Sequence, residues 1–186
     1  MKPIPAVCIT GGIASGKSTV LRILRDLGWE TASSDEISAE VFQMPDIQDF
    51  LRVQLGNEFT RSEVRARLAS DPDFRKKLNR LMHPLIAAHI ETLKYDAIEV
   101  PLAIETCMFG WFKEVWATEC GREIQIQRLA ERGIFGADAE ALLRTQVTEN
   151  VRSVFANRIL RTNLPESSVF NDIVRIAHKI ERGGLH

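Results

Sequence analysis

The segment that most constrains this chain is a glycine-rich stretch at residues 11–18, which lies between an apolar run and an amphipathic stretch. It reads GGIASGKS and matches the pattern G-x-x-x-x-G-K-[ST] at every defined position. The apolar residues 6–9 predict a short buried strand before it. After it, apolar side chains recur at helical spacing up to Gly28, namely at Val20, Leu21, Leu24 and Leu27. The chain is therefore predicted to begin with a strand, a glycine loop and a helix.

The spacing of this motif has a physical explanation in phosphate binding. Glycines let the backbone turn its N–H groups toward one anion, and the following helix presents its positive dipole end to the same anion. Lys17 can reach the β- and γ-phosphates of ATP, and Ser18 can offer a hydroxyl to Mg²⁺. The alternative is a glycine turn that only joins a strand to a helix. The predicted ATP-binding residues are Gly11, Gly12, Ile13, Ala14, Ser15, Gly16, Lys17, Ser18 and Thr19.

The rest of the chain alternates between apolar runs and helical patterns. Further strands are predicted at residues 29–32, 99–105, 115–120 and 158–162. Helices are predicted over most of residues 36–95 and at residues 123–132, 138–154 and 169–180. Pro72 and Pro84 are expected at first helical positions, with Asp71 and His83 before them as caps. Strands separated by helices indicate an α/β fold with a parallel sheet, and the long strandless stretch predicts a helical subdomain.

Two acidic residues, Asp35 and Glu105, come at or just after the ends of predicted strands. Because the carboxyl ends of parallel strands face the ligand crevice, Asp35 can accept the proton of an acceptor hydroxyl or hold Mg²⁺ through water. Glu105 can contact the shell of the same ion. The alternatives are a helix N-cap for Asp35 and a surface position at a strand end for Glu105.

Four arginines lie in two predicted helices of the C-terminal half, at residues 123–132 and 138–154. Arg128 and Arg132 are four residues apart and share a helix face, and Arg144 and Arg152 follow. Arginines on a closing lid can stabilise the negative charge that phosphoryl transfer spreads over the transferred oxygens. For each arginine alone, a solvated helix with ion pairs is the simpler explanation, but at least one of the four is expected to act in the reaction.

Composition narrows the classes of function. The chain has 186 residues, 45% hydrophobic content and a formal net charge of −1, which suits one compact domain and gives no reason to expect a nucleic-acid or membrane partner. The three cysteines form no C-x-x-C pair, so a disulfide framework is not expected. The N-terminal residues lack the features of a signal peptide, and the cytoplasm is the expected location. The expected partners are small-molecule substrates, with the chain as a monomer or weak homo-oligomer.

Several motifs together resemble the dephospho-CoA kinase family over almost the whole chain. The phosphate loop from Thr10 to Val20 is very similar, and Asp35 stands where the family has the second acid of Asp-Ala-Asp. His83-Pro84 resembles a histidine-proline motif, and the stretch at residues 100–105 resembles a Val-Pro-Leu-Leu-x-Glu strand. Residues that resemble the lid and the segment after it are Gln125, Arg128, Arg132, Gln146, Ala156 and Asn163.

This resemblance implies a P-loop nucleoside-triphosphate hydrolase-like fold with a five-stranded parallel sheet flanked by helices. It implies a single kinase domain over residues 1–186, with a helical substrate subdomain at residues 36–95 and a lid at residues 128–152. The implied reaction is ATP-dependent phosphorylation of the ribose 3′-hydroxyl of dephospho-CoA. The implied catalytic residues are Lys17, Asp35, Arg128 and Arg132.

The remaining site residues are assigned by the same resemblance. Asn163 is expected to contribute to ATP binding, and Ser18 and Glu105 are expected at Mg²⁺, the latter through water. The implied substrate-binding residues are Asp35, Arg61, His83 and Glu105.

The chain also departs from the family pattern. Ser33 replaces the first aspartate of the acid pair, Asn157 stands where an aspartate is expected, and Leu164 replaces a glycine. The latter two changes are expected near the adenine-side loop. These departures leave two alternatives open, which are a related P-loop kinase for another small alcohol or nucleoside and a weakly catalytic nucleotide- or CoA-binding homologue.

Overall fold

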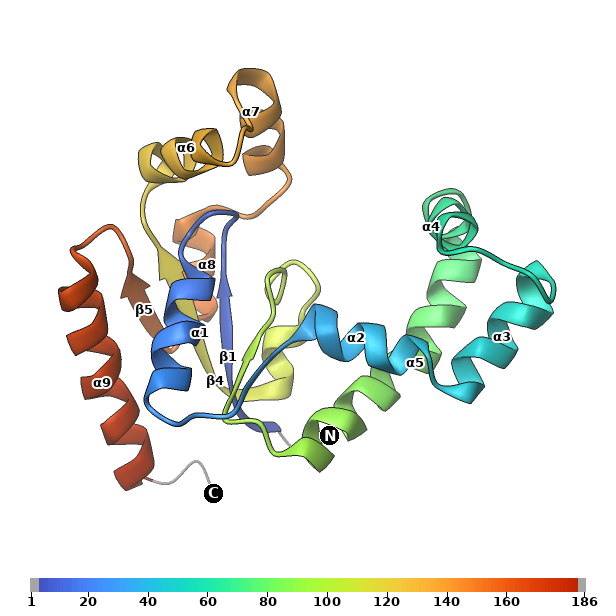
Figure 1. Cartoon of the computed structure of the whole chain (residues 1–186), viewed down its shortest axis with the longest axis horizontal. Helices are drawn as coiled ribbons and strands as arrows, with labels where there is room; N and C mark the ends of the chain where they lie inside the picture. The colour runs from blue at the N-terminus through green and yellow to red at the C-terminus, as the bar shows by residue number, and fades with distance from the viewer. Residues whose placement is uncertain (1–3, 184–186) are drawn as a thin grey trace. The chain divides into compact units, whose positions relative to one another are not determined.

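The computed structural model describes residues 4–183, and its centre is a five-stranded parallel sheet with the strand order β2-β3-β1-β4-β5 (Figure 1). This confirms the predicted α/β fold with five parallel strands. The prediction that the N-terminus is not a signal peptide rests partly on the first three residues, which lie outside the described residues. The strands are β1 (Ile4–Gly11), β2 (Thr31–Ser33), β3 (Ala97–Glu99), β4 (Phe112–Glu119) and β5 (Arg158–Arg161).

The chain divides into two compact units, and the first contains the sheet. This unit comprises residues 1–34 and 94–186. Figure 1 shows α6 and α7 beyond the carboxyl ends of β1 and β4, where the glycine loop also lies. The helices of this unit are α1 (Lys17–Asp26), η1 (Met108–Trp111), α6 (Arg122–Glu131), α7 (Gly136–Arg144), α8 (Glu149–Phe155) and α9 (Glu166–Gly183).

The main core of this unit lies between the sheet and the two helices α1 and α9. Alternate residues of β1, Val7 and Ile9, are fully buried there together with Trp116 of β4. The ring of Trp116 lies 6.0 Å from that of Trp29, and α9 contributes the fully buried Ile173. Burial of large apolar side chains at about 1.5–3 kcal/mol each holds α1, and with it the glycine loop, against the sheet.

The second unit, Asp35–Leu93, is entirely helical. The helix α4 begins with a capping box, in which Thr60 accepts from Glu63 N while Thr60 N donates to the Glu63 carboxylate. Asp71 caps α5 through Oδ1, which accepts from two backbone N–H groups, as expected. The helices are α2 (Ser34–Phe42), which begins in the first unit, α3 (Pro45–Leu55), α4 (Arg61–Ser70) and α5 (Pro72–Leu93).

Pro84 and His83 differ from their predicted positions. Both lie inside α5 rather than at the start of a helix, so His83 is not a cap. Buried Leu78, Ile86 and Ile90 continue one helical stripe on both sides of the proline. Packing of this stripe therefore outweighs the loss of one backbone hydrogen bond.

The strand predicted at residues 99–105 is also wrong, because β3 ends at Glu99 and turns follow. Pro101 has no N–H to donate to a neighbouring strand. The next N–H groups donate within the turn instead, from Ala103 to Val100 O and from Thr106 to Leu102 O. Glu105 therefore stands in a turn and not on a strand.

The single helix predicted at residues 138–154 is two helices, α7 and α8, separated by residues 145–148. Val147 N leaves the helical ladder and donates to Glu105 Oε1 at 3.1 Å. Thr148 then caps α8 by accepting from Val151 N at 3.4 Å. A tertiary contact and a new cap thus interrupt a sequence with continuous helical periodicity.

No helix within residues 4–183 combines the length and the apolar character that crossing a membrane requires.

Candidate nucleotide and acceptor sites

The phosphate loop follows β1 directly and ends where α1 begins. Gly16 caps the helix with φ of 92° and ψ of 17°, a left-handed conformation that glycine adopts without a Cβ clash. The Lys17 ammonium donates to Gly11 O at 3.0 Å and to Gly12 O at 2.9 Å, so its charge lies over the first residues of the loop. Burial lowers the pKa of Lys17, which an anionic ligand would oppose by stabilising the charged form.

Buried hydroxyl groups support the loop from behind. Ser15 Oγ and Thr118 Oγ1 are 2.6 Å apart, and Thr162 Oγ1 donates to Ser15 O at 2.6 Å. All three residues are at most 5% exposed. The sequence analysis missed Thr118 and Thr162, although each hydroxyl stands at the carboxyl end of an apolar strand. That position, next to the predicted ligand edge, was the available signal.

Three side chains from the α6–α7 region also hold the loop. Gln146 Oε1 accepts from Ile13 N at 2.7 Å, and Gln125 Nε2 donates to Ile13 O at 2.8 Å. The Arg128 guanidinium donates to Ala14 O at 3.0 Å and to Thr162 O at 2.7 Å. Arg128 therefore bridges the loop to the end of β5, and its donors are directed at backbone carbonyls.

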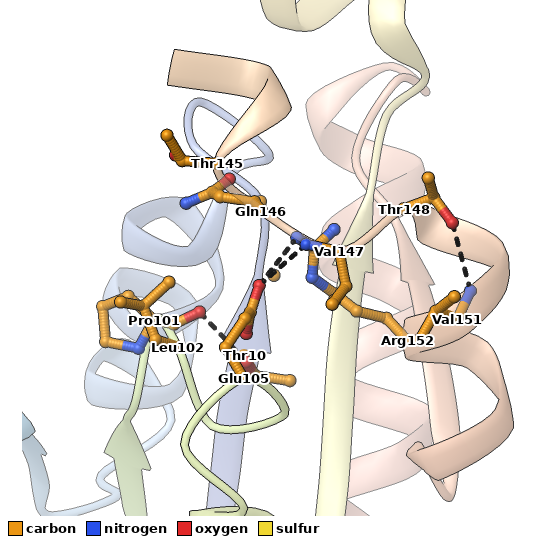
Figure 2. A network of polar contacts seen from close by, with 12 residues as sticks. Thr10, Pro101, Leu102, Glu105, Thr145, Gln146, Val147, Thr148, Val151 and Arg152 are labelled. Atoms are coloured by element: carbon orange, nitrogen blue, oxygen red, sulfur yellow. Dashed lines mark hydrogen bonds and ion pairs between the residues drawn. The ribbon is translucent and has the colours of Figure 1, made fainter. Parts of the chain in front are cut away.

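Glu105 lies at the centre of a polar network between the turn after β3 and the segment before α8 (Figure 2). Its Oε1 accepts from Val147 N at 3.1 Å and lies 3.6 Å from Nη2 of Arg152. Its Oε2 is buried and has no hydrogen-bond partner among the described residues. One carboxylate oxygen of Glu105 thus fixes the segment before α8, while the other oxygen accepts no hydrogen bond within the described residues.

The outer side of the loop is open to solvent. A cavity of about 230 Å³ has Ser18, Thr19, Arg128 and Arg132 among its lining residues. Ser18 and Arg132 are exposed, so both can reach a ligand placed there. Asn163, the further ATP-binding candidate, is exposed just beyond β5 and is not one of the residues that line this cavity.

The second unit has its own cavity, of about 310 Å³. Asp35, Arg61 and Arg65 supply charged groups to its lining, beside an apolar wall that includes Val64 and Leu68. His83 is exposed on α5 and does not line this cavity. The structure thus brings two of the predicted acceptor-site residues, Asp35 and Arg61, to one cavity and places His83 outside it.

Asn157 precedes β5 and lies at the amino end of that strand, whereas the phosphate loop lies at the carboxyl ends of the strands. Its Oδ1 accepts from Val115 N at 2.7 Å, and its own N donates to Val115 O at 2.8 Å. The side chain therefore extends the pairing of β4 with β5 by one residue. An aspartate would accept the same bond, so this departure leaves the strand pairing intact.

A family model and the curated relatives indicate one family. A family model described as dephospho-CoA kinase matches residues 5–166. A dephospho-CoA kinase from Dehalococcoides mccartyi is 33% identical over 177 residues, which cover 84% of this chain and 88% of that protein.

Among solved structures, a protein from Thermus thermophilus superposes with a TM-score of 0.76 at 23% identity, covering 96% of this chain and 98% of that one. A dephospho-CoA kinase from Campylobacter jejuni gives a TM-score of 0.61 at 19% identity, covering 95% and 97%. These two likenesses concern the fold. With the family match over most of its length, this chain belongs to the dephospho-CoA kinase family.

Proposed function

We propose that this chain transfers the γ-phosphoryl group of ATP to the ribose 3′-hydroxyl of dephospho-CoA. The observation that carries the proposal is the Lys17 ammonium held over Gly11 and Gly12 inside a left-handed glycine loop, in a chain of this family. The loop supplies N–H groups and one positive charge to a polyphosphate, and the start of α1 adds its dipole.

In this proposal the nucleotide lies along the loop and α1. Lys17 and the lid arginines stabilise the charge that builds on the γ-phosphoryl oxygens. Residues 128–152 act as the lid, and its closure excludes water that would otherwise compete as acceptor. Arg132 is exposed beside the start of α1, whereas Arg128 contributes by fixing the loop to β5. Asn163 is placed at the adenine end.

The helical unit, residues 36–95, binds the acceptor in this proposal. Dephospho-CoA carries a pyrophosphate and a long uncharged arm, and the cavity combines Arg61 and Arg65 with apolar side chains. The 3′-oxygen attacks the γ-phosphorus, the bond from that phosphorus to the β–γ bridging oxygen breaks, and ADP leaves. Asp35 accepts the hydroxyl proton. His83, outside this cavity, would touch only a part of the acceptor that extends beyond it.

Magnesium fits the residues that are present. The exposed Ser18 hydroxyl and the vacant Oε2 of Glu105 are oxygen ligands of the kind that Mg²⁺ prefers. Within residues 4–183 no group of three or more His, Cys, Asp or Glu side chains forms a ready metal site, which suits an ion held largely by water and substrate phosphates. When bound, the ion would neutralise charge on the phosphate oxygens.

The test is ADP release by the purified chain with ATP and Mg²⁺, measured with and without dephospho-CoA. We expect release that depends on the acceptor, together with a product heavier by one phosphoryl group in mass spectrometry. A 3′-deoxy analogue of dephospho-CoA is the matched control, because it lacks the nucleophile. The variant Lys17→Ala controls for contaminating kinases.

Absence of acceptor-dependent ADP release at high enzyme concentration would overturn the proposal. A panel of small alcohols and nucleosides then separates the alternatives. Turnover with another acceptor would indicate a related P-loop kinase. Tight binding of ATP or dephospho-CoA without transfer would indicate a nucleotide- or CoA-binding protein.

A further inference from the structure

Arg152, on α8, is a buried charged residue of the first unit. It is 2% exposed, and its Nε has no hydrogen-bond partner among the described residues. Enclosing a guanidinium costs several kcal/mol unless its charge and its donors are matched. A buried arginine with an unused donor therefore calls for an explanation.

The ion pair that Arg152 makes with Glu105 is a loose one. The distance of 3.6 Å between Arg152 Nη2 and Glu105 Oε1 exceeds hydrogen-bond distance, and the same oxygen already accepts from Val147 N. Figure 2 shows the guanidinium directed at this shared oxygen. Arg128 is the contrast within the same region, since it donates at 3.0 Å and 2.7 Å to two backbone carbonyls. Arg128 is engaged in structure. The carboxylates of Glu105, Glu149 and Glu119 favour the charged form of Arg152, but its Nε has no hydrogen-bond partner among the described residues and is available to a further anion.

The position of Arg152 indicates which anion this is. A Cβ built on Gly12 would lie 3.2 Å from Nη1 of Arg152 and 2.6 Å from Gln125 Nε2. The guanidinium therefore stands against the first half of the phosphate loop, at a place that only glycine leaves open. It also lines a cavity of about 260 Å³ together with Gln125 and Gln146.

Different charged side chains lie at the two ends of the loop. Lys17, which reaches the β- and γ-phosphates in this motif, has its ammonium at Gly11 and Gly12. Arg152 lies at that same end. Arg128 and Arg132 line the other cavity, beside Ser18 and Thr19 at the start of α1.

We propose that Arg152 is the catalytic residue that contacts the γ-phosphoryl group, and that Glu105 holds it in place until ATP arrives. This inference rests on the proposed function, within which it identifies the acting arginine. A planar guanidinium can bind two phosphoryl oxygens at once, which gives stronger stabilisation than a point charge. The γ-phosphoryl oxygens accept hydrogen bonds from the guanidinium donors that Glu105 leaves unused, and their negative charge balances the charge of Arg152.

The experiment compares the affinities of ATP and ADP, measured by calorimetry with Mg²⁺ and without acceptor, for wild type, Arg152→Ala and Arg152→Lys. We expect Arg152→Ala to weaken ATP at least about 10-fold more than ADP, since a charge-assisted bidentate contact is lost. Arg152→Lys should restore only part of this difference, because a lysine cannot make the bidentate contact. Turnover should fall about 100-fold or more in both.

Arg175→Ala is the matched control, since Arg175 is an exposed arginine on α9 that forms an ion pair with Asp172, and it should leave the ATP-to-ADP affinity ratio unchanged. Circular dichroism and thermal unfolding check that each variant folds. Equal weakening of ATP and ADP, or no change in their ratio in the folded Arg152→Lys variant, would overturn the assignment. Because the binding test uses no dephospho-CoA, a changed ratio without acceptor turnover would reject only the proposed acceptor and keep Arg152 at the γ-phosphoryl group.

Discussion

The phosphate loop and the cavity of the helical unit are built in opposite ways. Around the loop, backbone atoms of Ile13 and Ser15 pair with side chains that follow them by more than a hundred positions in the sequence. In the helical unit, the exposed Asp35 and Arg61 stand on an apolar wall formed by local helix packing. A site held by many distant bonds resists change, while one with a few charged groups on an apolar wall can acquire a new acceptor through few substitutions. The predictions below test this difference.

The largest expected effect is at the proposed acceptor site, where Asp35 is the proposed base. Asp35→Asn removes the proposed base and should lower kcat by about 10²–10⁴-fold, because proton transfer contributes that much. The affinity for ATP should remain, since Asp35 lines the cavity of the helical unit. Steady-state turnover and calorimetry measure the two quantities. The neighbouring Glu36→Gln is the control, and equal turnover in Asp35→Asn would reject the base.

At the phosphate loop, the addition of one methyl group should weaken ATP binding strongly. Gly16 has φ of 92°, and a Cβ there would lie 2.8 Å from Thr162 Oγ1. Strain and overpacking together cost about 3 kcal/mol, so Gly16→Ala should weaken ATP about 100-fold. Gly133→Ala is matched to it, since Gly133 has φ of 78° but nothing lies within 4 Å of its added Cβ. Normal ATP affinity in Gly16→Ala would contradict the tightly held loop.

A smaller effect is expected in the cavity of the helical unit. Arg61→Ala should raise KM for dephospho-CoA about 10-fold, equivalent to ~1.4 kcal/mol, by removing one charge-assisted contact. The Kd for ATP should not change. Arg67→Ala, on the same helix, removes only an exposed ion pair with Asp71 at 3.0 Å and serves as the control. An equal loss of ATP affinity in Arg61→Ala would mean that the two ends are not independent.

The smallest effect concerns stability of the helical unit. Thr60→Ala removes the cap of α4 and should lower the free energy of unfolding by about 1 kcal/mol, measured in urea. Thr92→Ala, which deletes a hydroxyl that bonds Ala88 O inside α5, should cost less.

This cap also predicts a pH dependence. Hydrogen bonds from Thr60 lower the pKa of Glu63, so the contribution of that carboxylate is present above its ordinary pKa and is lost as pH falls through the lowered pKa. The difference between wild type and Thr60→Ala should therefore shrink on acidification. A difference that grows in acid would contradict the role of Glu63 in the box.

Local patterns allowed much of this structure to be predicted, and distant contacts account for most of what was missed. The strand, loop and helix around Lys17 follow from glycine spacing and apolar periodicity within a short segment. The break between α7 and α8 does not, because it depends on Glu105 accepting from Val147, which lies far along the chain. For the same reason Arg152 could be named among four arginines but not singled out, since burial and an unused donor are properties of the folded chain.

Two glutamines hold the backbone of Ile13. Gln125 donates to its C=O at 2.8 Å, and Gln146 accepts from its N–H at 2.7 Å. Fixing a residue's backbone costs about 1–2 kcal/mol of entropy, and here that loss occurs once, when the chain folds. ADP can then leave and ATP can bind at a loop that keeps its backbone conformation between turnovers.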